Sequence, residues 1–206
     1  MQCDHIFVDL AVTHPNPRIG QIIGIAVVRT TGKGKVLETF SEQVKLYVEL
    51  SEDEKKHLAG SDDSISLNAD SLKSVIGSMR KCILDTRRYD SSYLVIAAHA
   101  DTDRTYLRNF TNEKSEVFAG RAWLDILALS YPLWYNDMIS DRTFDSLCKH
   151  FKVENTSPNT ATGDCEALVR VYWALMTRYK TALGGEEILR EIGGSPLESF
   201  RKIVGL

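Results

Sequence analysis

The chain has 206 residues, of which 43% are hydrophobic and 26% charged, and its formal net charge is −3 at pH 7. This composition is that of a globular protein with enough residues for one domain and a substantial core. The small negative charge excludes a protein that coats polyanions with its whole surface, although it permits a local basic groove. No basic N-terminal stretch precedes an apolar run and no apolar segment reaches roughly 18 residues, so we expect neither a signal peptide nor a membrane span.

The four cysteines are scattered without a CxxC pair, and no two of the five histidines have metal-ligand spacing. This pattern favours free thiols in a reducing compartment over a disulfide framework or a zinc site. We therefore expect an intracellular protein, either cytoplasmic or nuclear.

The N-terminal part predicts three strands in a meander. Residues 6–13 and 21–29 are rich in β-branched and apolar residues, and the prolines within residues 14–17 end the first run. The segment Thr31-Gly32-Lys33-Gly34 predicts a hairpin turn before a third strand over residues 35–46. Its GKGK lacks the spacing of a phosphate-binding loop and precedes a strand, so we interpret it as a turn.

The rest of the chain predicts alternating helices and one buried strand. Residues 51–65 read as a charged, irregular connection, and the continuous apolar run over residues 93–98 is typical of a central strand. Helical periodicity covers residues 68–87, 103–110, 122–131, 142–151 and 164–179. The order predicts an α/β fold, with a central mixed sheet flanked by helices. We expect one domain over residues 1–180 and a helical tail over 181–206 that packs on it.

This arrangement places three carboxylates near one sheet. Asp9 lies within the first strand, Asp103 follows the apolar strand, and Asp164 opens the last long helix. Carboxylates held together need cations to neutralise them, and hard divalent ions in two-metal phosphoryl transfer prefer such oxygens. The alternative is structural: a hydrogen-bonded core group, a helix cap and a first-turn residue favoured by the helix dipole. Spacing alone does not choose between them.

Five stretches together resemble the DEDDh branch of the DnaQ-like 3′-to-5′ exonucleases, which have an RNase H-like fold. They are FVDLAVTHPNP, QIIGIAVV, LVIAAHADTDRTYL, AWLDILALSYPL and TFDSLCKHFKVENTSPNTATGDCEALVRVYWAL, in the family's order. The resemblance implies four acidic residues that bind two Mg²⁺ or Mn²⁺ ions. It also implies a histidine that activates water to attack the terminal phosphodiester of a single-stranded DNA or RNA 3′ end.

The resemblance assigns the metal ligands to Asp9, Asp103 and Asp164, with Asp101 as a fallback for the second. Asp125 resembles a further family aspartate that is more often a structural anchor than a ligand.

Two catalytic positions depart from the family pattern. Ala11 stands where the family has glutamate, and Asn159 stands where it has the histidine. An alanine coordinates no ion, and an asparagine takes no proton at neutral pH, so general-base help of roughly 10²–10⁴-fold is lost. We therefore predict little or no activity, whether the alanine is a natural loss or an engineered replacement.

Other side chains near these motifs are candidate nucleic-acid contacts, namely Leu10, Val12, His14, His99 and Arg104. The two histidines are also candidate substitutes for the missing base. We expect His99 to be packed, because it ends a buried strand, and His14 to be exposed near the mouth of the site.

Two non-catalytic functions stay open beside an impaired exonuclease. One is a protein that binds single-stranded nucleic acid without cleavage, for which exposed arginines such as Arg18 and Arg142 are candidate phosphate contacts. The other is a protein–protein module or a homodimer, with the aromatic segment over residues 131–135 and the C-terminal tail as candidate surfaces. The alternative is that the aromatic segment belongs to the core, which is the more common place for such a cluster.

Overall fold

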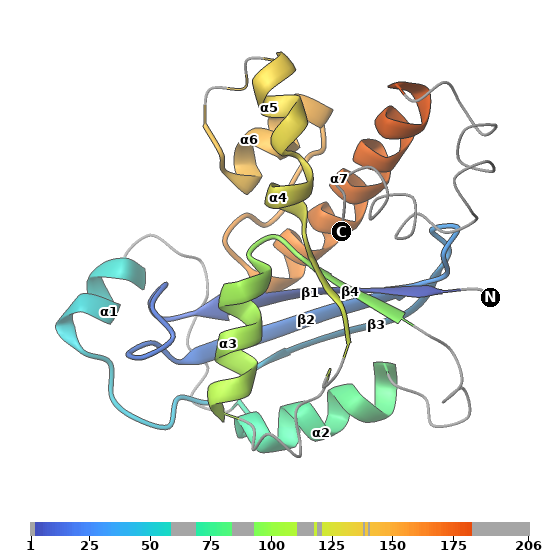
Figure 1. Cartoon of the computed structure of the whole chain (residues 1–206). Coiled ribbons are helices and arrows are strands. Elements are labelled where there is room, and N and C mark those ends of the chain that lie inside the picture. Colours follow the sequence, from blue (N-terminus) through green and yellow to red (C-terminus); the bar gives the residue numbers. More distant parts are fainter. Residues whose placement is uncertain are drawn as a thin grey trace.

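A mixed sheet of five strands forms the centre of the computed structural model, which describes residues 3–58, 69–83, 93–110, 118, 121–137, 139 and 141–182. The strand order is β3-β2-β1-β4-β5 (Figure 1). β1 pairs antiparallel with β2 and parallel with β4, β2 pairs antiparallel with β3, and β4 pairs parallel with β5. The strands are β1 (Asp4–Val12), β2 (Ile22–Thr30), β3 (Val36–Gln43), β4 (Tyr93–Ala97) and β5 (Trp123–Asp125). The predicted mixed sheet is confirmed.

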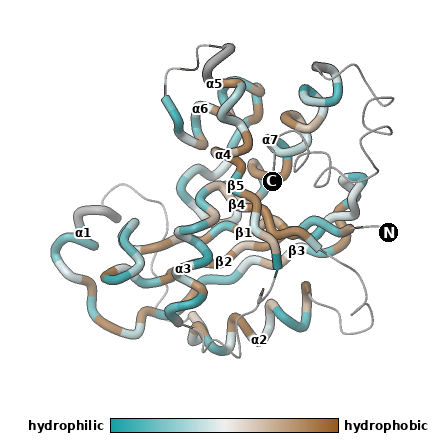
Figure 2. Tube along the Cα trace, viewed as in Figure 1, coloured by the Kyte–Doolittle hydropathy of each residue, from teal (hydrophilic) through white to brown (hydrophobic). Residues whose placement is uncertain are grey.

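Helices cover both faces of this sheet, and the side chains of β1 alternate between two cores. Phe7 lies in the core formed with α4–α7, and Ile6 lies in the core formed with α2 and α3. Figure 2 shows hydrophobic residues along the central strands, between these layers. The helices are α1 (Glu52–Leu58), α2 (Leu72–Ile83), α3 (Ala100–Phe110), α4 (Ile126–Leu129), α5 (Tyr131–Asp137), α6 (Phe144–Phe151) and α7 (Ala161–Ala182).

The expectation of an irregular connection after the third strand is wrong for residues 52–58, which form α1. Ser51 and Glu54 form a capping box: the backbone N–H and hydroxyl of Ser51 both donate to Glu54 Oε2 at 2.8 Å. The Glu54 carboxylate is buried and also accepts a hydrogen bond from the Thr13 hydroxyl, just after β1. The S-x-x-E pattern at residues 51–54 was a sequence signal for this helix.

The expectation of one helix over residues 122–131 is also wrong. Its first residues form β5, which pairs with Val95–Ala97 of β4, and α4 begins only after Asp125. A strand of three residues is too short to show an alternating hydrophobic pattern, so its pairing with β4 decides its conformation. The predicted hairpin turn is confirmed by the Gly34 N–H, which donates to the Thr31 carbonyl at 2.9 Å.

Other expectations concern the whole chain. The four cysteines are free, as predicted. Within the described ranges, no helix has both the length and the apolar character needed to cross a membrane. The predicted helical tail covers residues 181–206; residues 181 and 182 belong to α7, and residues 183–206 lie outside the described residues.

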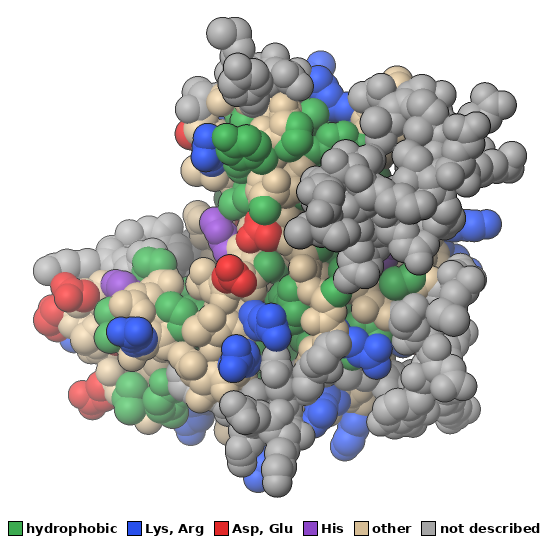
Figure 3. All heavy atoms as spheres, in the orientation of Figure 1, with side chains coloured by type: hydrophobic (Ala, Val, Ile, Leu, Met, Phe, Trp, Pro, Cys, Tyr) green, Lys and Arg blue, Asp and Glu red, His purple; other side chains and the backbone are tan. Residues whose placement is uncertain are grey.

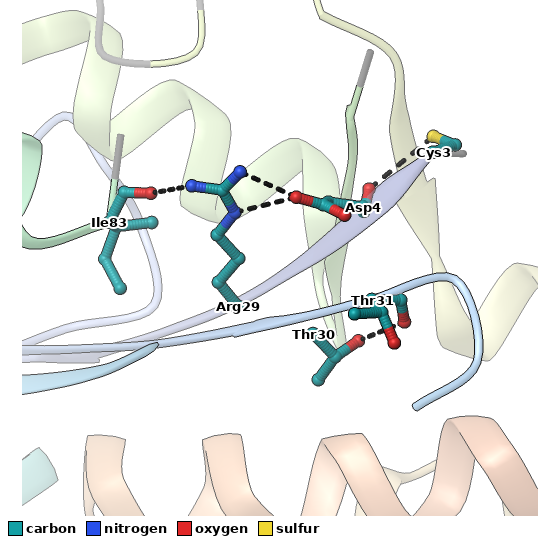
Figure 4. A network of polar contacts seen from close by, with 6 residues as sticks. All are labelled: Cys3, Asp4, Arg29, Thr30, Thr31 and Ile83. Carbon is teal, nitrogen blue, oxygen red and sulfur yellow. Dashed lines mark hydrogen bonds and ion pairs between the residues drawn. The ribbon is translucent and has the colours of Figure 1, made fainter. Parts of the chain in front are cut away.

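A buried ion pair ties the beginning of β1 to β2 and α2 (Figure 4). Asp4 Oδ2 accepts hydrogen bonds from Arg29 Nη2 at 2.6 Å and from Arg29 Nε at 3.0 Å. Arg29 Nη1 donates to the carbonyl of Ile83, the last residue of α2, at 2.9 Å. Both charged side chains are less than 10% exposed, so each depends on the other for compensation of its charge.

His5 follows this ion pair on β1 and is buried against aromatic rings. Its ring centroid lies 5.3 Å from that of Tyr172 and 5.4 Å from that of Trp173, and within the described ranges its Nδ1 atom has no hydrogen-bond partner. Burial lowers the pKa of His5 from 6.5 to about 4, although the neighbouring Asp4 charge acts in the opposite direction. The imidazole is therefore neutral in the folded protein at neutral pH.

We expect this burial to make the protein less stable in mild acid. The unfolded chain binds a proton at His5 below pH 6.5, whereas the folded chain does so only near pH 4. The stability contributed by His5 is thus complete above pH 6.5 and is lost as the pH falls toward 4, by about 3 kcal/mol in total. Urea unfolding at pH 7 and pH 4.5 measures the loss.

His5→Phe is the matched control, because it keeps a ring in the cluster and removes the titration. Asp103, whose pKa is raised, contributes equally in both proteins, so the comparison isolates His5. Equal pH dependence in the two proteins would contradict the prediction.

Candidate functional site

The first turns of α3 and α7 meet β1 around the buried thiol of Cys165. This thiol donates a hydrogen bond to the Phe7 carbonyl of β1, with 3.6 Å between sulfur and oxygen. Burial raises the pKa of Cys165, and the carboxyl groups of Asp9, Glu166 and Asp103 raise it further. Asp9 and Asp103 therefore both lie within electrostatic reach of this thiol, which directly follows Asp164 in the chain.

Asp103 is the more deeply buried of the two candidates for the second acid. Its side chain is 6% exposed, whereas Asp101 of the same helix is exposed. Its Oδ2 atom has no hydrogen-bond partner among the described residues. Burial raises the pKa of Asp103 well above its usual range, and the negative charge of Asp125 adds to this effect. Asp103 is thereby held toward its neutral, protonated form.

Asp125 itself connects two helices. Its Oδ1 atom accepts a hydrogen bond from the Ala128 N–H at 2.9 Å as the N-cap of α4. Its Oδ2 atom accepts another from the Ala100 N–H, the first residue of α3, at 3.0 Å. These contacts are those of the structural anchor that we expected.

Asp164 lies half-buried in the first turn of α7. Its Oδ1 atom accepts a hydrogen bond from the side-chain amide of Asn155 at 2.5 Å. The Asn155 Oδ1 atom in turn accepts the Ser157 N–H at 3.2 Å, which fixes the loop before the helix. Sequence reasoning missed Asn155, because no spacing or motif relates it to the acid.

Gly163 allows this loop to lie directly against α7. A Cβ atom at position 163 would overlap the Ser157 carbonyl and lie 2.9 Å from Asn155 Oδ1. We expect Gly163→Ala to lower the free energy of unfolding by about 1–3 kcal/mol, because the loop backbone must move. Gly77→Ala in α2 is the matched control: no described residue lies within 4 Å of its Cβ position, and alanine there should stabilise by about 0.5–1 kcal/mol. Similar thermal denaturation of the two variants would contradict this reading.

Ala11 lies opposite Gly24 in the β1–β2 pair, in a neighbourhood of small residues. A Cβ atom on Gly24 would lie 3.3 Å from the Ala11 Cβ and 3.6 Å from that of Ala161. Asn159 is exposed in the loop before α7, with a φ of 63°. Asparagine and histidine both tolerate this left-handed conformation better than most residues, so the backbone itself does not exclude the family's histidine there.

These side chains do not, as they lie, form a two-ion site. In the described part of the chain, no group of three or more His, Cys, Asp or Glu side chains is placed to hold a metal ion. Ala11 offers no ligand, Asp164 is hydrogen-bonded to Asn155, and Asp103 is held toward its neutral form.

The two histidines differ from expectation. His99 is exposed rather than packed, and its carbonyl accepts the Asp103 N–H at 3.0 Å where α3 begins. His14 is half-buried, and its Nδ1 atom accepts the Asn16 N–H at 3.0 Å. In the neutral imidazole this bond leaves the proton on Nε2, so His14 as it lies has no nitrogen available to act as a base.

The remaining candidate contacts lie in different environments. Leu10 is 8% exposed and belongs to the core on the α2 side, so it offers a ligand little surface, whereas Val12 and Arg104 are half-buried. In the aromatic segment, Leu133 and Trp134 lie in the core, which confirms the alternative for these two. Tyr131 is exposed, with the Arg142 guanidinium carbon 4.8 Å from its ring centroid.

Comparison with known proteins gives structural relatives only. No protein-family model and no curated protein matches the sequence. A 3′-exonuclease structure described as 3′-end-specific recognition of a histone mRNA stem-loop is 20% identical, with a TM-score of 0.62 over 85% of this chain and 82% of that one. The nuclease domain of 3′hExo, a DEDDh family member bound to rAMP, is 19% identical, with a TM-score of 0.62 over 85% and 92%.

A larger nuclease is also similar. E. coli exonuclease I in complex with single-stranded DNA is 13% identical, with a TM-score of 0.68 over 85% of this chain and 41% of that one. This chain thus spans less than half of exonuclease I. The strand order, the helices on both faces and these likenesses agree, and the chain has the DnaQ-like, RNase H-like fold of the 3′-to-5′ exonucleases.

Proposed function

We propose that the protein binds the 3′ end of a single-stranded nucleic acid where β1, α3 and α7 meet, and that it hydrolyses this end slowly or not at all. The observation that carries the proposal is Asp103, a buried carboxyl at the family's second acidic position, one oxygen of which bonds to no described residue. Burying such a group costs free energy unless a ligand or a partner compensates for it. Asp103 and Asp9 both act electrostatically on the Cys165 thiol, which supports a ligand site retained in this part of the fold.

Weak hydrolysis is supported by the two departures from the family pattern. Ala11 adds no carboxylate beside Asp9, and Asn159 supplies no base. His14 does not replace that base, since its Nδ1 accepts a backbone hydrogen bond. We expect any residual hydrolysis to require Mg²⁺ or Mn²⁺.

A nucleic-acid ligand is supported by the structural neighbours, whose descriptions include a histone mRNA stem-loop and single-stranded DNA. Helix α3 carries Arg104 and Arg108 behind the acidic residues of its first turn. Figure 3 shows Lys and Arg side chains over this helix, with acidic side chains near its start. Cations there would contact the phosphates of a strand that ends at the site.

The test is fluorescence anisotropy with 5′-labelled single-stranded DNA and RNA in EDTA, followed by gel analysis after incubation with Mn²⁺. We expect salt-sensitive binding, competition by linear but not by circular oligonucleotides, and strands that stay intact. Absence of binding, or equal competition by circles, would refute 3′-end binding. A rapid ladder of shortened products would refute weak hydrolysis.

A homodimer stays a prediction, which light scattering of the free protein would check. A protein partner also stays a prediction.

A further inference from the structure

A cavity of about 300 Å³ lies between the β2–β3 pair and the beginning of α7. The candidate 3′-end site described above assigns no function to this cavity. Its lining residues are Gly24, Ser41, Glu42, Gln43, Ser157, Thr160, Ala161 and Thr162. The volume is at the lower end of the range for small-molecule sites.

Apart from Glu42, the residues that line this cavity are uncharged, and four of them carry hydroxyl groups. Ser41 and Thr162 join β3 to α7 through their hydroxyl oxygens, 2.5 Å apart. Ser41 and Gln43 share the face of β3 that meets α7. Glu42 lies on the opposite face of β3. Burial raises the pKa of the Cys82 thiol on α2, and the negative charges of Glu38 and, less strongly, Glu42 raise it further. The lining thus offers hydroxyl and amide groups rather than a cation for phosphate.

The cavity and the candidate 3′-end site share a wall. Gly24 lines the cavity, and its Cβ position is 3.3 Å from the Cβ of Ala11. Ala161, which also lines it, lies 3.6 Å from the same position and begins the helix that carries Asp164. Asp9 and Ala11 share one face of β1, so a nucleotide bound at Asp9 would lie on the same face of the sheet as the cavity.

We infer that this cavity binds the sugar of a terminal ribonucleotide and makes the protein prefer RNA to DNA at the 3′ end. The inference rests on the proposed function. A 2′-hydroxyl both donates and accepts a hydrogen bond, and serine and threonine hydroxyls can do the same. A deoxyribose would leave these groups without that partner.

The experiment compares three 5′-labelled oligonucleotides of one sequence by anisotropy in EDTA: RNA, the same RNA with a 3′-terminal deoxynucleotide, and DNA. We expect the single terminal change to weaken binding three- to tenfold, as the loss of one or two hydrogen bonds does. Thr162→Val and Ser41→Ala should each abolish this ratio. Thr177→Val is the matched control, because Thr177 is exposed on the same helix, bonds to the Trp173 carbonyl, and lies outside the cavity.

Each outcome decides a different claim. Equal binding of RNA and of RNA with the terminal deoxynucleotide overturns the cavity inference and leaves 3′-end binding intact. Variants that weaken both ligands without changing their ratio also overturn it, because the cavity would then not sense the sugar. Absence of binding to all three oligonucleotides overturns this inference together with the proposed function. Circular dichroism and thermal denaturation confirm that each variant is folded.

Discussion

Arg29→Met is expected to lower the free energy of unfolding by about 3–5 kcal/mol. The substitution leaves the buried Asp4 carboxylate without its cation and removes the donor to the Ile83 carbonyl. A buried charge without compensation is far more costly than the original pair was favourable. Urea denaturation of the purified variant at pH 7 measures the effect.

Two controls separate burial from the ion pair as such. The double variant Arg29→Met with Asp4→Leu should recover much of the loss, because no charge then stays buried. Lys149→Met breaks the exposed ion pair between Lys149 Nζ and Asp145 Oδ2, which lie 2.5 Å apart. This change should lower the free energy of unfolding by less than about 1 kcal/mol. If Arg29→Met and Lys149→Met cost the same, the buried pair does not hold β1, β2 and α2 together.

Ala11→Glu combined with Asn159→His is expected to produce Mn²⁺-dependent shortening of single strands from the 3′ end. The glutamate adds a carboxylate on the face of β1 that carries Asp9, and a histidine base contributes roughly 10²–10⁴-fold to such reactions. Asn159 already has the left-handed backbone that a histidine can adopt. A gel assay of 5′-labelled DNA and RNA, beside the unchanged chain, measures the gain.

Thermal denaturation supplies a readout besides activity. Without ions, Ala11→Glu should lower the melting temperature, because it places a second carboxylate on the face of β1 that carries Asp9. Mn²⁺ at a hundred times its Kd should then stabilise the variant by about 2.7 kcal/mol. Ala11→Gln, of the same size but neutral, is the control and should not respond to Mn²⁺.

If the double variant neither responds to Mn²⁺ nor shortens strands, the site lacks more than these two groups. Asn155 would then be the next residue to change, since its amide holds the Asp164 carboxylate. Adding Asn155→Ala releases that carboxylate and tests whether the amide stands in the way of an ion.

Much of the fold could be predicted because its determinants are local. The apolar run of β4, the β-branched run of β2 and the hairpin at Gly34 each depend on residues that are neighbours in sequence. The two departures of the site, at Ala11 and Asn159, were likewise visible in the sequence. They are defined by the absence of a chemical group, which needs no coordinates.

The contacts that decide the site join segments far apart in sequence, and only the order of the strands and the packing of α7 bring them together. Examples are the hydroxyl contact between Ser41 and Thr162, the meeting of Gly24 with Ala11 and Ala161, and the burial of Asp103 beside Asp125. No local pattern marks such pairs, because each residue alone is compatible with many neighbours. The sequence by itself determined that positions 11 and 159 hold an alanine and an asparagine, from which we predict weak catalysis, and the tertiary structure decided what surrounds these residues.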